Sequence, residues 1–366
     1  MDKRNIEAIY PLSPTQRGLL LYLVVSGSDG RPSNAFFEQF HATFHGPLDP
    51  AHLRAAWEHV IERHPSLRTL FLWERRDTPV QVVLRSIDVP FVVEDWRDRS
   101  AEQQEADLEA LLRAEQDRGF RLDRGPLVRF FVLRTGDETH RFVWCFSHLV
   151  LDGWSIAKVF GEAMQSHTAI SRGDSPELAP AVPYRDYIAW LDGQDENEAE
   201  AFWRRTLDGS DGATSLPGDR DPGAPMTRHG ARLDSTRKIS RPLGRDTWDA
   251  IHTLCRNRRL TPNAFFQGVW GLLLARTTGE DDVLWGSVVS GRTPEVEGVE
   301  DIVGLFINAL PVRAQIDPQR AFGEWLSDLQ LQLVDQRQFE YVPVESIQRW
   351  LDMPRERPLF ESHFIY

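Results

Sequence analysis

The segment FVWCFSHLVLDGWSIAKVF, residues 142–160, connects an apolar run to a helical pattern and places polar side chains at the junction. The apolar run ends in Ser147 and His148, and it has the length and composition of a buried strand. Asp152 follows after three apolar residues, and a helix with one apolar face is predicted from there on. A short loop between two rigid elements is a usual location for functional side chains.

The residue types at this junction suit proton transfer and helix capping. A neutral imidazole at His148 could accept or deliver a proton near pH 7. Asp152 lies just before the predicted helix, where its carboxylate could accept from free backbone N–H groups or pair with an arginine. Gly153 permits a sharp turn. A purely structural histidine at a strand end also fits this pattern.

Two other kinds of site fit the segment poorly. Neighbouring residues on a strand point to opposite faces, so Ser147 is expected to face away from His148. The serine also lacks the G-x-S-x-G pattern of a hydrolase nucleophile, which argues against a Ser-His-Asp hydrolase. One histidine with an aspartate four residues later, without a second His or Cys cluster, is a weak metal site.

Composition narrows the functional class. The chain has 366 residues, which favours two lobes over one core, and a formal net charge of -13, which argues against general nucleic-acid binding. No apolar run approaches the roughly 18 residues of a membrane span, and the first residues lack the apolar region of a signal peptide. Cys145 and Cys255 are too few for a disulfide framework. We therefore expect a cytoplasmic protein with no membrane partner.

Strand and helix patterns mix without strict alternation, so the predicted fold class is mixed α/β. The Pro- and Ser-rich stretch 171–183 is the best linker, giving predicted lobes 1–175 and 176–366, and 208–230 is predicted to be a long exposed loop. The sequence ends inside an apolar strand-like run, so we expect an incomplete C-terminal lobe. The predicted strands are 38–46, 69–74, 79–84, 127–134, 139–148, 282–291, 303–316 and 359–366; those over 69–74 and 79–84 are expected to pair as a hairpin. The predicted helices are 50–64, 101–118, 155–170, 322–339 and one within 259–279 that is capped by Thr261 or Asn263.

Several stretches, taken in order, resemble the motifs of one family. SHLVLDGWS resembles the active-site motif of the condensation domains of nonribosomal peptide synthetases, in which two histidines, three variable residues and Asp-Gly form the signature. The resemblance covers essentially the whole chain. Its other motifs are YPLSPTQRGLLLY (10–22), RHPSLRTLF (63–71), YRDYIAWL (184–191), VGLFINALPVR (303–313), DQRQFEYVPVESIQ (335–348) and RPLFESHFIY (357–366).

The resemblance implies a fold and an activity. Two chloramphenicol-acetyltransferase-like lobes would form a V-shaped pseudo-dimer with the active site at its base. An acyl or peptidyl donor and an aminoacyl acceptor would arrive as thioesters on the phosphopantetheine arms of an upstream and a downstream carrier protein. The acceptor amine would attack the donor carbonyl, and an amide would form. The domain itself would bind no cofactor or metal, and an adenylation domain would be its neighbour.

The resemblance also assigns residues. His148 matches the second, catalytic histidine of the motif. Asp152 and Gly153 match its Asp-Gly; the aspartate is expected to be structural and to pair with Arg68. Substrate-tunnel residues are expected at Trp154, Ser155 and Asn308.

Ser147 departs from the motif, because the family usually has its first histidine there. Since that residue should face away from the tunnel, we expect a structural role for Ser147 and a preserved activity. The alternative is a non-catalytic, condensation-like scaffold that recruits carrier proteins or tailoring enzymes. An epimerisation domain of the same fold would need an added glutamate base that we cannot identify, and the cyclisation subgroup replaces the histidines by aspartates.

Overall fold

The computed structural model divides the chain into two compact units. Unit 1 comprises residues 1–193 and 294–306, and unit 2 comprises residues 194–293 and 307–366. We refer to 294–306 as the return segment, because it brings the chain back into unit 1. Within the units, the residues described are 2–27, 33–74, 76–210, 212–216, 238–354 and 358–366.

This division differs from the predicted boundary after residue 175. Helix α5 (Tyr184–Asp192) follows the predicted linker but belongs to unit 1. The rings of Tyr184 and Tyr187 pack on Phe306 of the return segment, with ring centroids 5.3 and 4.4 Å away. The linker composition of 171–183 therefore marks a surface loop, while aromatic packing decides where unit 1 ends.

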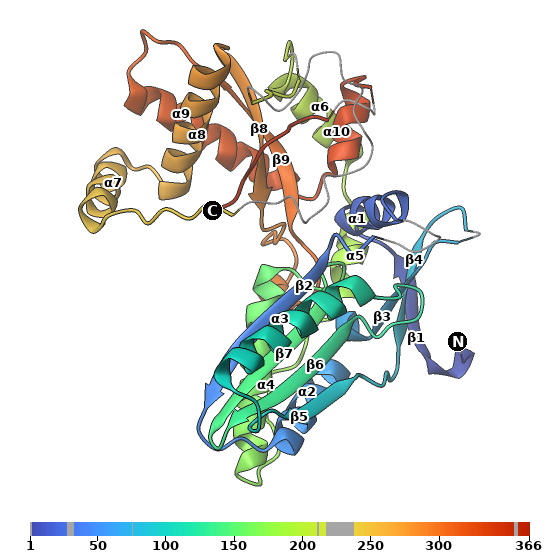
Figure 1. Ribbon diagram of the computed structural model, residues 1–366. Helices are drawn as coiled ribbons and strands as arrows, with labels where there is room; N and C mark the ends of the chain where they lie inside the picture. The colour runs from blue at the N-terminus through green and yellow to red at the C-terminus, as the bar shows by residue number, and fades with distance from the viewer. Residues whose placement is uncertain (1, 28–32, 75, 211, 217–237, 355–357) are drawn as a thin grey trace. The chain divides into compact units, whose positions relative to one another are not determined.

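A four-stranded sheet is the centre of unit 1 (Figure 1). Its order is β2-β7-β6-β5; β5 runs parallel to β6, and the other neighbours are antiparallel. Helix α3 covers one face and helices α2 and α4 cover the other. These elements are β2 (Phe37–His45), β5 (Phe91–Asp95), β6 (Val128–Gly136), β7 (Thr139–Ser147), α2 (Pro50–Arg63), α3 (Ala101–Arg118) and α4 (Gly153–Ser171).

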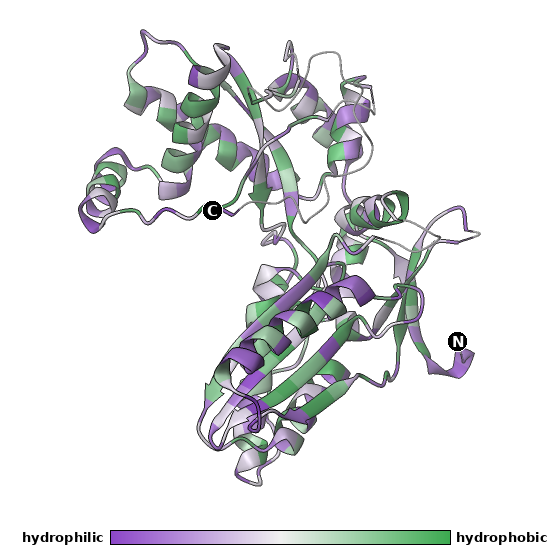
Figure 2. Cartoon of the chain, in the orientation of Figure 1, coloured by the Kyte–Doolittle hydropathy of each residue, from purple (hydrophilic) through white to green (hydrophobic). Residues whose placement is uncertain are grey.

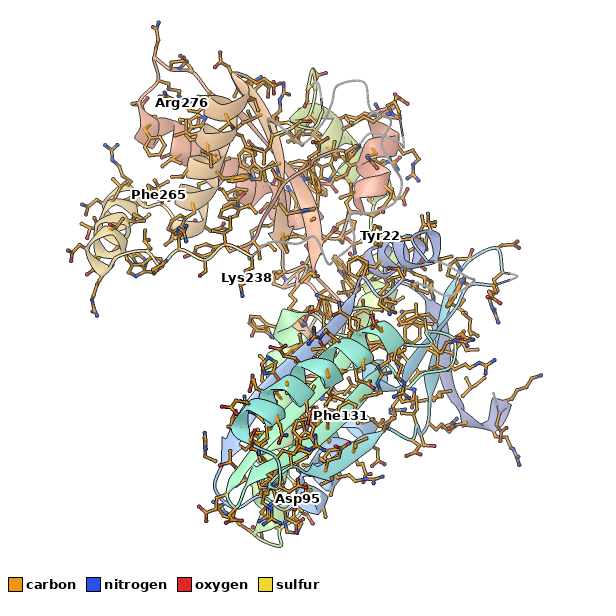
Figure 3. All side chains as sticks on the ribbon, viewed as in Figure 1. Tyr22, Asp95, Phe131, Lys238, Phe265 and Arg276 are labelled. Carbon is orange, nitrogen blue, oxygen red and sulfur yellow. The ribbon has the colours of Figure 1, made fainter. Side chains whose placement is uncertain are left out.

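The alternation of side chains along β7 separates two cores. Phe142, Trp144 and Phe146 belong to the core under α2 and α4, whereas Val143 and Cys145 pack beneath α3. Such burial on both faces explains why this stretch is a continuous apolar run in the sequence. In Figure 2 the strands β6 and β7 are largely hydrophobic while hydrophilic residues recur along α3, and Figure 3 labels Phe131 on the sheet beside this helix.

A second sheet of unit 1 has the order β1-β4-β3 and is antiparallel throughout. Its β3 (Thr69–Leu72) and β4 (Val80–Leu84) confirm the hairpin predicted from 69–74 and 79–84. Strand β1 (Ile6–Pro11) leads into helix α1 (Pro14–Val25), and the short 3-10 helix η2 (Pro65–Arg68) precedes β3.

Unit 2 contains the three-stranded sheet β10-β8-β9. Helix α8 begins after Thr261, one of the two predicted caps, and the Thr261 hydroxyl accepts from the N–H of Ala264. Phe265, labelled in Figure 3, lies in the first turns of this helix. The elements are α6 (Glu196–Thr206), α7 (Arg245–Arg258), α8 (Pro262–Thr278), β8 (Asp282–Val289), β9 (Asn308–Gln315), α9 (Phe322–Gln336), α10 (Val344–Trp350) and β10 (His363–Phe364).

Three strand predictions in this part were too long, and the one over 282–291 ends at Val289. The strand predicted from residue 303 begins at Asn308, because residues 303–306 belong to unit 1. Of the residues in the strand predicted over 359–366, His363 and Phe364 form strand β10, which pairs with β8. Residues 217–230 of the predicted loop lie outside the described residues. The mixed α/β class is confirmed, and the incomplete C-terminal lobe stays a prediction. Among the helices described, none is long and apolar enough to cross a lipid bilayer.

Candidate active site

His148 is placed by the sheet. Its N–H donates to the carbonyl of Phe36 at 2.9 Å, directly beyond the last β2–β7 pair, Phe37 with Ser147. The side chain is half-buried, and its Nδ1 is buried without a hydrogen-bond partner in the described part of the chain. Because Nδ1 is buried, proton transfer to or from a substrate would use the other ring nitrogen, Nε2, of this half-buried imidazole.

Ser147 lies on the opposite face of the sheet from the α2 and α4 core. It lines a small cavity together with Phe37 and Phe120, which belong to or pack against the core under α3. Its Oγ accepts from the N–H of Leu149 at 3.4 Å. Ser147 therefore lies on the α3 side of the sheet, in line with the alternation of Val143 and Cys145 along β7, and the opposite orientation of His148 stays a prediction.

Asp152 is fully buried and fixes two main-chain segments at once. Its Oδ1 accepts from the N–H of Ser155 at 2.7 Å and caps α4, and its Oδ2 accepts from the N–H of Phe306 at 3.1 Å. Its own N–H donates to the carbonyl of Gly304 at 3.2 Å. A buried carboxylate is tolerated when such charge-assisted bonds satisfy it, and here they fasten the return segment to the start of α4.

Three further side chains hydrogen-bond to the main chain of the return segment. Ser155 donates its hydroxyl to the carbonyl of Gly304 at 2.8 Å and accepts from the N–H of the same residue at 3.0 Å. Ser66 donates to the carbonyl of Val303, and Tyr184 donates to that of Leu305. A Cβ at residue 304 would lie 2.2 Å from the Tyr184 ring, so only glycine allows this approach. Ser155, predicted to line a tunnel, is buried and holds the main chain of Gly304 by two hydrogen bonds.

The predicted pair between Arg68 and Asp152 is wrong for the described contacts. The Arg68 guanidinium donates to Glu7 at 2.7 Å and to the carbonyls of Ile61 and Glu62 at 3.1 and 3.0 Å. The last carbonyls of a helix lack partners within it, and Arg68 follows α2 closely enough to satisfy them. Arg68 therefore stabilises the end of α2 against β1.

A cluster of charged residues lies further along α4. We call it the charged cluster, and it comprises Arg63, His64, Lys158, Glu162 and Asp301. Glu162 contacts His64 Nε2 at 2.6 Å, Arg63 Nε at 3.0 Å and Lys158 Nζ at 3.4 Å, and Lys158 also contacts Asp301 of the return segment at 2.7 Å. Burial alone would raise the pKa of Glu162, but its cationic neighbours and the bond from His64 lower it to about 2. Burial lowers the pKa of His64 in spite of the carboxylate.

The remaining predicted residues have separate surroundings. Gly153 begins α4 and is exposed, with nothing within 4 Å of an added Cβ. Trp154 is 53% exposed, and its Nε1 donates to the carbonyl of Glu300 at 3.0 Å. Asn308 belongs to unit 2, where its amide donates to the carbonyls of Glu340 and Val342. Their roles beside a substrate stay predictions.

Comparison with known proteins identifies the family. The profile of the condensation domain matches residues 6–366. The chain belongs to the condensation domain family. Over 99% of its length it is 38% identical to a linear gramicidin synthase of Brevibacillus parabrevis, and over 94% it is 32% identical to bacitracin synthase 3 of Bacillus licheniformis. This condensation domain spans 7% and 5% of the lengths of those two relatives.

Solved structures share the fold of this condensation domain. The starter condensation domain of rhizomide synthetase RzmA matches 98% of the chain, with 78% of its own length covered, at a TM-score of 0.76 and 19% identity. The X-domain from teicoplanin biosynthesis matches 96%, with 76% of its own length covered, at a TM-score of 0.77 and 24% identity. At these identities the likeness concerns the fold alone.

Several residues around the site were missed in the sequence. Ser66, Tyr184 and Gly304 act through contacts between distant segments, which local patterns do not reveal. Glu162 looks like an ordinary polar helix residue, and only the fold brings His64 to it. Gln16 had a readable signal, because it stands three residues after Ser13 in the spacing of a capping box.

Proposed function

We propose that this condensation domain joins a donor acyl or peptidyl thioester to an acceptor aminoacyl thioester. The nitrogen of the acceptor amine attacks the donor carbonyl; the new C–N bond forms, and the C–S bond to the donor's phosphopantetheine arm breaks. The amine loses a proton, and the departing sulfur leaves as a thiol. The chain itself supplies positioning and proton transfer, and no bound cofactor takes part.

The observation that supports this proposal most strongly is the placement of His148. Its main chain is fixed in the sheet, while its Nδ1 has no partner among the described residues. Asp152, in contrast, holds the N–H groups of Ser155 and Phe306. We therefore assign proton transfer or positioning of the amine to His148 and a structural role to Asp152.

The same proposal covers the partners and the arrangement of the molecule. Donor and acceptor would come on phosphopantetheine arms of an upstream and a downstream carrier protein, with an adenylation domain nearby, in the cytoplasm. The great length of the relatives supports such neighbours, as does the fold likeness to a four-domain nonribosomal peptide synthetase at a TM-score of 0.78 and 16% identity over 99% of this chain and 26% of that one. The two units would adopt the V-shaped arrangement of lobes implied by the family resemblance.

The test is single-turnover amide formation with donor-loaded and acceptor-loaded carrier proteins. His148→Ala should lower the rate by roughly 10²- to 10⁴-fold, the usual contribution of a positioned acid or base. The matched control is His52→Ala, because the His52 side chain is 41% exposed on α2. An unchanged rate in His148→Ala would remove both roles from this residue.

A non-catalytic scaffold is the second candidate. The X-domain from teicoplanin biosynthesis, which has also been solved in complex with OxyB, resembles this chain as closely in fold as the starter condensation domain does. The fold therefore does not separate the two candidates. A parent chain that forms no product under single-turnover conditions, yet binds loaded carrier proteins or a tailoring enzyme, would favour the scaffold.

A further inference from the structure

A buried pair of amides connects the opening motif of the sequence to the loop after His148. Gln16 on α1 and Gln81 on β4 are 2% and 1% exposed. The Nε2 of Gln16 donates to the carbonyl of Leu149 at 3.0 Å, and the Nε2 of Gln81 donates to the Oε1 of Gln16 at 2.9 Å and to the carbonyl of Pro11 at 2.9 Å. The bond to Leu149 joins residues 133 positions apart, next to the candidate catalytic histidine.

Gln16 also belongs to the capping box of α1. Its Oε1 accepts from the N–H of Ser13 at 3.0 Å, and Ser13 Oγ accepts from the N–H of Gln16 at 3.1 Å. Because Oε1 accepts from both Ser13 and Gln81, the amide orientation is fixed by the network, and Nε2 must point to the Leu149 carbonyl. The capping box thus uses Oε1 of Gln16, while Nε2 donates to the Leu149 carbonyl at 3.0 Å and, over a longer distance of 3.4 Å, to Gln81 Oε1.

A second capping box in the same unit shows what capping alone requires. On α3, Ser100 and Gln103 make the same two bonds at 3.3 and 2.9 Å. Gln103 is exposed, whereas Gln16 is buried. Capping a helix therefore does not require the burial found at Gln16, and the bonds to Leu149 and Gln81 distinguish Gln16 from Gln103.

His148 is held on both sides of its Cα. Its N–H is bonded to the carbonyl of Phe36, and the carbonyl of the next residue, Leu149, is bonded to Gln16. Resting on the proposed function, we propose that Gln16 is a positioning residue that orients the loop after β7 and thereby sets the direction of the His148 imidazole. A displacement of about 1 Å at a reacting group can cost about 10²-fold in rate.

The test replaces Gln16 by Glu and, as a matched control, Gln103 by Glu. Glutamate keeps the shape and an acceptor for Ser13, but once ionised it has no donor for the Leu149 carbonyl; protonated, it regains one. Burial raises the pKa of such a carboxyl, whereas the N–H donors of Ser13 and Gln81 lower it, so the rates of variant and parent are compared over a range of pH that brackets the ionisation. We expect Gln16→Glu to react roughly 10- to 100-fold more slowly than the parent where its carboxyl is ionised and to approach the parent rate as the pH falls. Gln103→Glu should match the parent throughout.

A ratio of rates that does not change with pH would overturn the proposal. If ionised Gln16→Glu unfolds, Gln16→Met serves as the second variant: it fills the same volume, lacks the donor at every pH, and should react slowly with a ratio to the parent that is independent of pH. A folded Gln16→Met that reacts at the parent rate would also overturn the proposal.

A spectroscopic arm separates this inference from the proposed function. The imidazole ¹H–¹⁵N signals of His148, assigned by their loss in His148→Ala, should shift in Gln16→Glu as its carboxyl ionises and should stay at the parent positions in Gln103→Glu. A parent chain that makes no product but shows these shifts would refute condensation while supporting the positioning role. Coincident His148 signals in all three proteins would refute the positioning role even in an active enzyme.

Discussion

The two faces of the four-stranded sheet each bury an acidic residue with a basic partner, and they use it differently. Beneath α3, the Glu115 carboxylate accepts from the Arg129 guanidinium, which also donates to the carbonyl of Gly119 at the end of the same helix. On the other face, Glu162 reaches the return segment through Lys158 and Asp301. The Arg129 guanidinium thus bonds to α3 and to the glycine at its end. The contacts of Glu162, in contrast, lead to the return segment, which Asp152 also holds beside the candidate site.

The comparison predicts that α3-face changes affect stability without affecting chemistry. Glu115→Ala leaves Arg129, whose side chain is 6% exposed, as an uncompensated buried charge. The expected loss is about 3–5 kcal/mol in the free energy of unfolding, with an unchanged single-turnover rate for the folded fraction. Urea unfolding and amide formation, measured on the same preparation, check both parts. A rate that drops in fully folded Glu115→Ala would break the distinction between the faces.

Glu162→Gln tests the other face, and its effect depends on pH. The pKa of Glu162 falls from 4.5 to about 2 on folding. Because the folded-state pKa lies below the unfolded one, the stabilisation is fully present above about pH 4.5 and is lost as the pH falls toward 2. The lowering corresponds to about 3 kcal/mol at neutral pH as an upper figure. The difference in urea midpoint between parent and Glu162→Gln should therefore be large at pH 7 and should shrink between pH 4.5 and pH 3.

Hydrogen exchange can show which segments lose stability in Glu162→Gln. Amides of α4 and of residues 299–306 should exchange faster in Glu162→Gln at pH 7, because the variant weakens the attraction among His64, Lys158 and residue 162. Glu58→Gln is the control, since Glu58 lies 59% exposed on α2 and pairs with Arg54. Equal exchange in the return segment of both variants would show that the charged cluster stabilises α4 alone.

Asp152→Ala should have a smaller effect on stability. The variant removes the acceptor for the N–H groups of Ser155 and Phe306, and leaving buried donors unpaired costs about 1–3 kcal/mol. Two measurements separate a structural from a catalytic role of Asp152. Thermal unfolding gives the loss of stability, and the single-turnover rate is then measured at a temperature where the variant is folded. A variant that melts like the parent but forms no product would give Asp152 a catalytic role in place of a structural one.

The sequence predicted the elements that depend on local chemistry. Helix α3 covers the predicted range 101–118 and ends at Gly119, which has a φ of 56°. The two cores on either side of β7 also follow from alternation. The prediction that failed was a pairing between distant segments. The resemblance assigned Arg68 to Asp152, but the buried Arg68 guanidinium donates to the carbonyls of Ile61 and Glu62, which lie close to it at the end of α2.

The contacts of the return segment could not be predicted for the same reason. Residues 303–316 look like one apolar strand, because both a strand of unit 2 and a segment buried in unit 1 need apolar side chains. Nothing in the local pattern marks the change at Ile307, where the chain passes from one unit to the other. Gly304 is the exception, because a glycine within an apolar run signals a close backbone approach, and here that approach is to Tyr184.

Ser147→His gives the smallest expected effect and tests whether the two faces of the sheet have separate roles. The larger ring would enter the small cavity beside Phe37 and Phe120, so overpacking should cost about 1 kcal/mol or somewhat more. The rate of amide formation should remain close to that of the parent, because the variant leaves His148 itself unchanged. If the parent formed no product while Ser147→His did, the α3 face would contribute to the chemistry, and the separation drawn from the alternation of β7 would be wrong.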